Sequence, residues 1–452
     1  MKRSRHPPGR PHAAEGTYCV PAPPGLSQSG ITLVPEPSRV ALRPFMPGDN
    51  PFPTATLGVS RMDAVIGRIL TLDDASAEAE LGRIRASLRG RHVNVDAVLE
   101  RRFHDLCAPG THWHSATPHQ RLLIGAHFTE EYAFEAAALF NPSIVPHPDQ
   151  SAAPPGGLRF VLSLRAIGEG HISSITFRTG QVDAAGQFKL EPPSEFAISP
   201  SIELLPGIAP DDPGVRLICH DHDDLSAVVI FPVTYRQRHG LEDLRLTRFA
   251  EDDGTTAYLG TYTAVGGETV RQELLRTTDF ETFELTALQG RYAATKGMAL
   301  FPRRIDGVYV MLGRQDHENI WVLRSNRLYE WDEGHAVLAP RWPWEFVQLG
   351  NCGPPIEIDE GWLVLTHGVG AIRNYCIGAC LLDRDDPTNV LGRTRHPLIV
   401  PTCLGRDGYV PNVTYSCGSL VHRRSLILPY ALADSFTSLA TVDLDWLLGT
   451  ME

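Results

Sequence analysis

A recurring strand pattern beyond residue 140 constrains the fold of this chain more than any other feature. Short apolar runs alternate there with turn signals such as Pro-Pro-Gly-Gly at 154–157, Asp-Gly at 306–307 and Asp-Gly at 407–408. Five of the runs resemble one another, because each is an apolar strand whose last residues become polar. These runs are 159–165, 257–263, 308–314, 362–367 and 426–434.

The spacing of the five runs favours a repeated β architecture. Apart from one longer gap, they lie some 50 to 65 residues apart, which suits one four-stranded blade per repeat. We therefore predict an all-β fold, a five-bladed β-propeller, rather than a β-sandwich with unrelated strand ends. In a propeller the polar ends of the runs would converge in one funnel: Arg165, Thr263, Arg314, His367 and Asp434.

The chain before this region has a different character. Residues 1–29 are rich in Pro, Gly, His and Arg and are typical of a disordered leader. Between residues 60 and 127, apolar side chains recur at helical spacing. We expect a disordered leader at 1–29, a mostly helical N-terminal extension at 30–127 and the propeller at 128–452.

Composition limits the kinds of partner. The 452 residues carry a formal net charge of −12, which argues against non-specific nucleic-acid binding. We find no secretory signal and no apolar run of the roughly 18 residues that a membrane span requires. The eight cysteines are scattered without a CxxC pair, so we predict reduced thiols and a cytoplasmic protein that binds neither nucleic acid nor membrane.

Two adjacent carboxylates, Glu242 and Asp243, are the first candidates for chemistry. They follow Gly240 at the start of a strand-like run and lie among several arginines. Neighbouring residues of a regular strand point to opposite faces, so we expect one carboxylate to face a cavity and the other to brace an arginine such as Arg245. That difference suits acid–base chemistry on a sugar, whereas the alternative is a solvated salt-bridge cluster.

The order of motifs along 140–448 resembles glycoside hydrolase family 130, the β-mannoside phosphorylases and β-mannosidases. The motifs are Phe-Asn-Pro at 140–142, Gly-Leu-Glu-Asp-Leu-Arg at 240–245, Lys-Gly-Met-Ala-Leu-Phe-Pro at 296–302, Gly-Asn-Cys-Gly-Pro-Pro at 350–355, Thr-His-Gly-Val at 366–369, Val-Pro-Asn-Val at 410–413 and Ala-Asp at 433–434. The fold that this resemblance implies is a five-bladed β-propeller. The long N-terminal segment and the Gly-Glu-Gly-His run at 168–171 resemble the extended members.

The resemblance also implies roles for single residues. Asp243 matches the catalytic acid, which must be protonated in the working complex although the reference pKa of Asp is about 3.9. Asn141, Arg165 and Asp434 match residues that hold the terminal mannosyl ring, and Glu242 is a further sugar-binding candidate. If the chain is a phosphorylase, the matching phosphate ligands are Arg314, His367, Tyr375 and Lys296.

Two departures from the family pattern bear on the nucleophile. The lysine that precedes the Gly-Pro-Pro loop is replaced by Gln348, and an Arg-Asn pair is replaced by Ala294 and Thr295. Loss of these cations weakens a phosphate site. We therefore expect an inverting hydrolase that uses water, with Glu169 as the candidate base, although a loop glutamate is more often solvated.

The sequence leaves more than one function open. The alternatives to hydrolysis are phosphorolysis, which releases α-mannose 1-phosphate, and a non-catalytic propeller that binds glycans. We predict no catalytic metal and no cofactor, since no zinc-ligand spacing is present; inorganic phosphate would be a co-substrate of a phosphorylase. The expected ligand is a β-1,2- or β-1,4-mannoside oligosaccharide. The chain is also expected to associate with copies of itself as a homo-oligomer.

Overall fold

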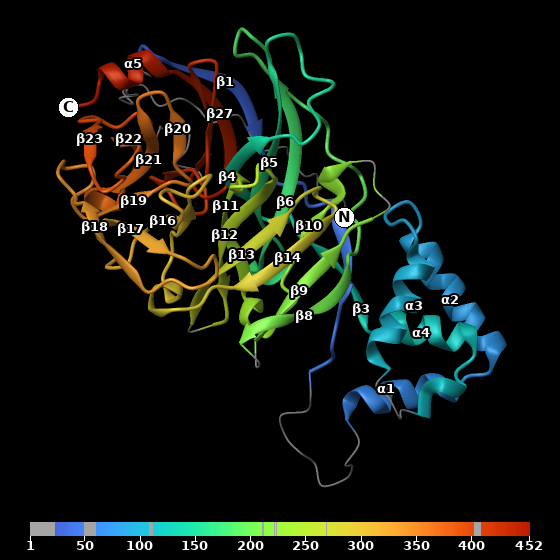
Figure 1. The fold of residues 1–452 in the computed structure, drawn as a ribbon. Helices are drawn as coiled ribbons and strands as arrows, with labels where there is room; N and C mark the ends of the chain where they lie inside the picture. Colours follow the sequence, from blue (N-terminus) through green and yellow to red (C-terminus); the bar gives the residue numbers. More distant parts are fainter. Residues whose placement is uncertain are drawn as a thin grey trace.

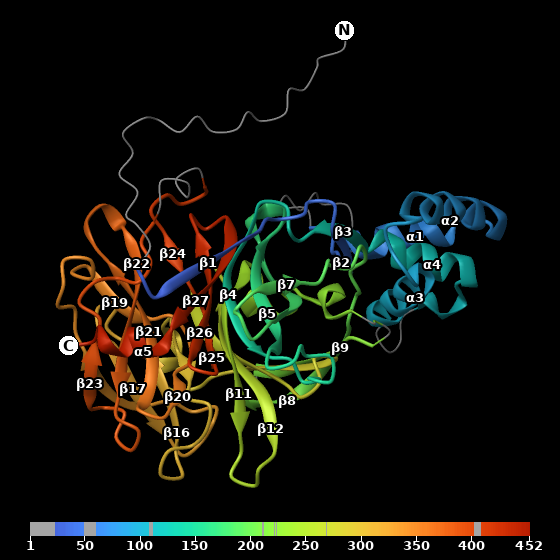
Figure 2. The ribbon, with the colours of Figure 1, turned by 90° about the horizontal axis from the view of Figure 1, so that it is seen from above.

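The computed structural model of the chain describes residues 23–452 except 49–59, 108–111, 210–211, 221, 223, 268 and 402–407. Strands form most of the regular secondary structure of the described chain, and most of its helix lies near the N-terminus. Figure 1 shows the helical segment standing to one side of the β region, and the view from above in Figure 2 agrees. The expectation of a mostly β chain with N-terminal helices is confirmed.

Side-chain caps mark the start of three of the four helices in this segment. Ser60 accepts a hydrogen bond from the backbone of Asp63, and Thr117 forms a capping box with Gln120. The apolar faces of the helices pack around Ile66, Phe103 and other buried residues. The helices are α1 (Arg61–Leu70), α2 (Asp74–Leu88), α3 (Val95–Leu106) and α4 (Pro118–His127).

The β region is a series of antiparallel units. The largest sheet contains two of them, which are joined by a single parallel contact between Gly240 and Ser173. Its first unit consists of β4 (Ala138–Pro146), β5 (Leu158–Ile167) and β6 (Ser173–Val182), with β7 (Phe188–Leu190) and β10 (Val229–Ile230) beside β6. Its second unit runs through β11 (Gly240–Ala250), β12 (Thr256–Val265), β13 (Val270–Thr277), β14 (Thr282–Ala287), β9 (Asp212–Ile218) and β8 (Ser201–Ala209).

Three further sheets follow in the described part of the chain. One contains β15 (Ala299–Leu300), β16 (Tyr309–Gly313), β17 (Ile320–Ser325) and β18 (Glu333–Leu338). The next contains β19 (Gln348–Asn351), β21 (Gly361–Val369), β22 (Tyr375–Leu382) and β23 (Val390–Arg393), with β20 (Ile356–Ile358) beside β21. The last contains β24 (Thr414–Tyr415), β26 (Ser425–Leu432), β27 (Phe436–Asp443) and β1 (Leu26–Leu33), with β25 (Leu420–His422) beside β26; α5 (Leu444–Gly449) follows β27.

The five runs that were singled out in the sequence lie in β5, β12, β16, β21 and β26. In every sheet, the neighbours of that strand are antiparallel to it. Each run therefore occupies the second position of its unit, after β4, β11, β15, β19 or β24. The period thus identified one equivalent strand per unit.

The N-terminal boundary of the prediction needs a correction. Leu26–Leu33 is a strand that pairs antiparallel with β27, so Leu26 faces Val442 across the sheet. The last residues of the expected leader are therefore ordered, because alternating side chains of this short strand pack on the C-terminal sheet. Figure 1 shows β1, in blue, beside β27, in red. Residues 1–22 lie outside the described residues.

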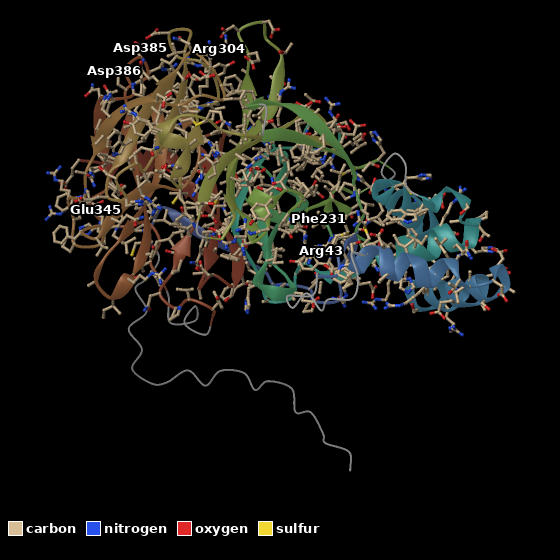
Figure 3. All side chains as sticks on the ribbon, turned by 90° about the horizontal axis from the view of Figure 1, so that it is seen from below. Arg43, Phe231, Arg304, Glu345, Asp385 and Asp386 are labelled. Carbon is tan, nitrogen blue, oxygen red and sulfur yellow. The ribbon has the colours of Figure 1, made fainter. Side chains whose placement is uncertain are left out.

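A two-stranded sheet of β2 (Val40–Pro44) and β3 (Thr129–Ala133) lies between the helices and the β region. Arg43 of β2 pairs with Glu130 at 2.6 Å, and its guanidinium lies 3.6 Å from the ring centre of Tyr132. Figure 3 shows Arg43 on the side of the helices, whereas Asp385 and Asp386 lie at the other end of the molecule.

The structure also bears on the cysteines and on membrane-spanning helices. Six of the eight cysteines fall within the described chain and none of these six forms a disulfide; Cys19 and Cys403 lie outside it. Within the described ranges, no helix combines the length and the apolar character that a membrane crossing needs.

Candidate active site

Three Asx residues with left-handed backbone form the frame of the site. Asn141 has a φ of 48°, Asp243 of 57° and Asp434 of 48°. The first two lie where β4 and β11 shift register against their partner strands, and Asp434 lies in the turn between β26 and β27. Asn and Asp enter this backbone region more readily than other residues with a β-carbon, and bulges of this kind re-aim side chains.

The re-aimed side chains meet in a polar cluster. Asn141 donates from Nδ2 to Oδ1 of Asp243 at 2.6 Å, and Arg165 donates from Nη1 to the same oxygen at 3.3 Å. Arg165 also donates from Nη2 to Oε1 of Glu242 at 2.7 Å, while Lys296 donates from Nζ to Oε2 of Glu242 at 2.8 Å. The side chains of Arg165, Glu242 and Asp243 are each 17% exposed, so a ligand can reach them.

Two sequence expectations for this cluster are wrong. Glu242 and Asp243 do not face opposite sides, since both bind Arg165. The bulge at Asp243 breaks the alternation of the strand, which the sequence argument had assumed to be regular. Glu242 braces Arg165 and Lys296 rather than Arg245, which instead donates to the backbone oxygen of Asp243 at 3.0 Å.

Electrostatics favour the ionised form of Asp243 in the free site. Burial pushes the pKa of Asp243 upward, but Arg165, Arg245 and the hydrogen bond from Asn141 outweigh burial and hold the pKa below its usual value. Asp434 shows the opposite balance. Burial, reinforced by the charge of Asp243, raises the pKa of Asp434 to about 6.

A second cluster of cationic and aromatic side chains adjoins the carboxylates. Arg314 places Nη1 3.1 Å from Nε2 of His367, and Gln348 places its amide nitrogen 3.3 Å from the same atom. Because Arg can only donate, Nε2 of His367 must be the acceptor. The His367 ring stacks on Tyr375, with centroids 6.0 Å apart, and lies 4.8 Å from the Tyr415 ring. Burial, and then the charge of Arg314, hold the pKa of His367 well below 6.5, so the ring is neutral.

Tyr415 joins the two clusters and was missed in the sequence. Its hydroxyl accepts from Nη2 of Arg245 at 2.9 Å, and its ring contacts His367. The residue comes just after the Val-Pro-Asn-Val motif at 410–413, and that proximity was the available signal. Arg373 was also missed. It lies in the turn η6 (Ala371–Arg373) at a φ of 52°, and its charge partly offsets the rise in the pKa of Asp434.

The structure does not bring every candidate together. Glu169 lies in the turn η2 (Glu169–His171) and is exposed, and among the described residues its carboxylate has no hydrogen-bond or ion-pair partner. Its neighbour His171 stacks on Tyr409, with centroids 6.2 Å apart. Thr263, one of the five polar strand ends, is buried and accepts from Gln272 instead.

Within the described ranges, no three His, Cys, Asp or Glu side chains are grouped as a metal ion would require. The residues that surround Asp243 are chiefly cations and amides, which suit anions and hydroxyls rather than a metal.

Comparison with known sequences decides the family. The sequence profile of glycoside hydrolase family 130, described as beta-1,4-mannooligosaccharide phosphorylase, matches residues 221–452, about half of the chain. The chain belongs to glycoside hydrolase family 130. The matched part contains Glu242, Asp243, Lys296, Arg314 and His367, whereas Asn141 and Arg165 lie before it.

Two curated relatives of family 130 show how far the likeness extends. A 1,2-beta-oligomannan phosphorylase of Thermoanaerobacter sp. (strain X514) is 36% identical over 152 residues, which cover 33% of this chain and 51% of the relative. A beta-1,2-mannobiose phosphorylase of Listeria innocua is 32% identical over 225 residues, which cover 48% of this chain and 60% of the relative. The chain thus spans about half to three-fifths of the length of these relatives.

The fold is also similar to a solved family 130 structure. That structure was described among glycoside hydrolases that target beta-1,2 mannosidic linkages in Candida mannan. It superposes with a TM-score of 0.50 at 18% identity, over 69% of this chain and 86% of the other.

Proposed function

We propose that this chain is a β-mannoside phosphorylase. Phosphate attacks the anomeric carbon of a terminal β-mannosyl unit, the carbon–oxygen bond to the leaving group breaks, and α-mannose 1-phosphate forms with inversion. Asp243 gives its proton to the leaving oxygen, and the proton of hydrogenphosphate restores Asp243 through solvent. Phosphate is a co-substrate, and the reaction needs no cofactor, as family membership implies.

The observation that carries this proposal is the cationic cluster beside the acid. Lys296 lies 2.8 Å from Glu242, the neighbour of Asp243, and Arg314 lies against His367. Cations in this position suit an anionic nucleophile. A hydrolase would need a base carboxylate across the sugar from the acid, and the carboxylate of Glu169, the expected base, is exposed with no hydrogen-bond or ion-pair partner among the described residues. The curated relatives named for β-1,2- or β-1,4-mannoside substrates are phosphorylases. Phosphorolysis is therefore better supported than the hydrolysis expected from sequence.

We propose the following roles for the remaining site residues. Asn141, Arg165 and Asp434 hold the mannosyl ring, since their polar atoms surround Asp243. Arg314, Lys296, His367 and Tyr375 hold phosphate. His367 is neutral, so the full positive charges in this set come from Arg314 and Lys296.

We further propose that the five antiparallel units are the blades of a five-bladed propeller. The equivalent position of β5, β12, β16, β21 and β26 in their units supports this arrangement. So does the meeting of residues from different units: Arg165 of β5 contacts Asp243 of β11, and Arg314, which follows β16, contacts His367 of β21.

The nucleophile can be tested directly. The protein is incubated with β-1,2-mannobiose and, separately, with β-1,4-mannobiose, each with and without phosphate, and the products are identified by NMR. Phosphorolysis predicts turnover that requires phosphate and yields α-mannose 1-phosphate and mannose. Release of mannose alone at equal rates in both buffers would show hydrolysis. Binding without turnover in either buffer would indicate a non-catalytic glycan-binding protein.

One variant sharpens this assay. Glu169→Gln leaves phosphorolysis unchanged, because Glu169 takes no part in it. In a hydrolase that uses Glu169 as base, the same change lowers the rate by about 10²–10⁴.

A further inference from the structure

Glu242 occupies the middle of the site and binds a cation with each carboxylate oxygen. Oε1 accepts from Arg165 at 2.7 Å and Oε2 accepts from Lys296 at 2.8 Å. Arg165 belongs to the sugar side of the site, because it also contacts Asp243. Lys296 belongs to the anion side, since a β-carbon added at Gly297, its chain neighbour, would lie 3.8 Å from the β-carbon of Arg314. Glu242 therefore connects two groups that serve different ligands.

The two cations differ in their freedom to move. Arg165 is fixed by a hydrogen bond from Nε to Ser173 at 2.9 Å, and its guanidinium lies 5.0 Å from the ring centre of Phe140. Lys296 is 39% exposed, against 17% for Glu242 and Arg165, and Glu242 is its one hydrogen-bond partner among the described residues. Lys296 can therefore separate from Glu242 at a lower cost in free energy than Arg165 can.

The choice of lysine at this position is consistent with that freedom. The chain contains 41 basic residues, and three of them are lysines: Lys2, Lys189 and Lys296. Lysine is a point charge on a flexible stem, whereas arginine is a rigid fork that would grip a carboxylate through two bonds. A cation that must change partners is better served by lysine.

We propose that Glu242 is a positioning residue that couples the binding of sugar to the binding of phosphate; this inference rests on the proposed phosphorylase function. In the free site, Lys296 and Oε2 of Glu242 neutralise each other. Phosphate takes Lys296, which releases Oε2 to accept a hydrogen bond from a sugar hydroxyl. A sugar that takes Oε2 releases Lys296 for phosphate in the same way.

This exchange has a thermodynamic consequence. Each ligand removes a competitor of the other, so sugar and phosphate bind with positive cooperativity. Coupling between two binding equilibria is reciprocal, so mannose must tighten phosphate binding by the same factor by which phosphate tightens mannose binding. We expect a factor of at least about five, at the lower end of typical coupling.

The test measures both affinities by isothermal titration calorimetry. Phosphate is titrated into the full-length protein with and without saturating mannose, and mannose with and without saturating phosphate. In the unaltered protein, each ligand lowers the dissociation constant of the other. In Glu242→Gln, Lys296 is already free, so phosphate binds without sugar about as tightly as it binds to the unaltered protein with sugar, and the coupling factor falls to about one.

Two further variants keep the test decisive. Lys296→Met changes a partly exposed side chain, so the fold persists; phosphate binding weakens and no longer depends on mannose. Lys189→Met, on the exposed side of β7, leaves affinities and coupling unchanged.

If Glu242 had only a structural role, Glu242→Gln would weaken the binding of both sugar and phosphate and leave the coupling factor unchanged. That result would overturn the inference. The inference would also be overturned if the unaltered protein bound phosphate with the same affinity in the presence and absence of mannose. Absence of phosphate binding in the unaltered protein would overturn the proposed function itself.

Discussion

At the scale of single residues, the site shifts the pKa values of Asp243 and Asp434 in opposite directions. Asp243 is surrounded by guanidinium groups and is ionised in the free protein, whereas Asp434 keeps a proton up to about pH 6. An acid catalyst must carry a proton in the working complex. The proposed mechanism therefore requires that bound sugar and phosphate offset the arginines around Asp243 and raise its pKa.

The role of Asp243 leads to a first prediction. Asp243→Asn lowers the rate of mannoside cleavage by about 10²–10⁴, the usual contribution of a positioned acid, while the fold is retained because Asn tolerates the same left-handed backbone. Steady-state rates and circular dichroism provide the measurement. Asp252→Asn, which removes an exposed ion pair with Arg304, is the matched control and keeps full activity. Full activity in Asp243→Asn would contradict the assignment.

The raised pKa of Asp434 leads to a second prediction, for stability. The folded protein binds this proton more tightly than the unfolded chain does, so stability falls as pH rises from about 4 to about 6 and stays lower above that range. Asp434→Asn removes the cost of ionising this buried carboxyl in the folded protein. Above pH 6 we therefore expect the variant to be more stable than the unaltered protein by on the order of 1–3 kcal/mol. Urea unfolding at pH 4 and pH 7.5 measures it. An equal stability difference at both pH values would exclude Asp434 as the cause.

At the scale of elements, the site depends on irregularities in otherwise regular strands. Sequence periodicity located β5 and β21, which carry Arg165 and His367, and β16, which Arg314 follows, because buried strands leave a clear apolar pattern. It could not locate the bulges at Asn141 and Asp243, since one extra residue in a strand leaves no mark on composition. The sharing of Arg165 by two adjacent carboxylates follows from such a bulge and could not be predicted.

Close packing of a glycine against His367 gives a third prediction. A β-carbon at Gly350 would lie 2.4 Å from Cε1 of His367, whose ring is buried. Gly350→Ala therefore displaces the ring from Arg314 and, we expect, raises KM for phosphate about tenfold with a smaller effect on KM for the sugar, at a stability cost of about 1–3 kcal/mol. Steady-state kinetics with each substrate varied in turn measures the difference.

The control for this prediction lies in α2. Gly82 is exposed and no heavy atom lies near the position of an added β-carbon. Gly82→Ala leaves both KM values unchanged and stabilises the helix by about 0.8–1 kcal/mol. If Gly350→Ala changed neither KM, the proposed phosphate role of His367 would lose its support.

At the scale of the whole molecule, the first described strand belongs to the last sheet. β1 pairs with β27, so the two ends of the described chain are held together. The mostly β architecture and its period were readable from the sequence, because each unit repeats the same apolar run. The pairing of β1 was not, since a short strand in a Pro- and Gly-rich region resembles a disordered segment, and its partner lies more than 400 residues away.

That pairing leads to a fourth prediction. Leu26 is 8% exposed and packs in the core of the C-terminal sheet. We expect Leu26→Ala to lower the free energy of unfolding by about 2–3 kcal/mol, which urea denaturation measures. Val34→Ala, at a side chain that is 55% exposed, is the control and changes stability by less than about 0.5 kcal/mol. Equal effects of the two changes would show that β1 does not stabilise the molecule.

The left-handed backbone at Asn141, Asp243 and Asp434 also limits how such a protein can evolve. Codons for aspartate and asparagine differ in a single base, and both residues accept this backbone. One nucleotide change can therefore turn the proposed acid into an amide within an intact fold, which would leave a protein that holds its sugar without cleaving it. Replacement of Asp243 by glutamate keeps the carboxylate but meets a backbone that glutamate rarely adopts. Loss of activity is thus a short evolutionary step here, whereas a replacement acid is harder to acquire.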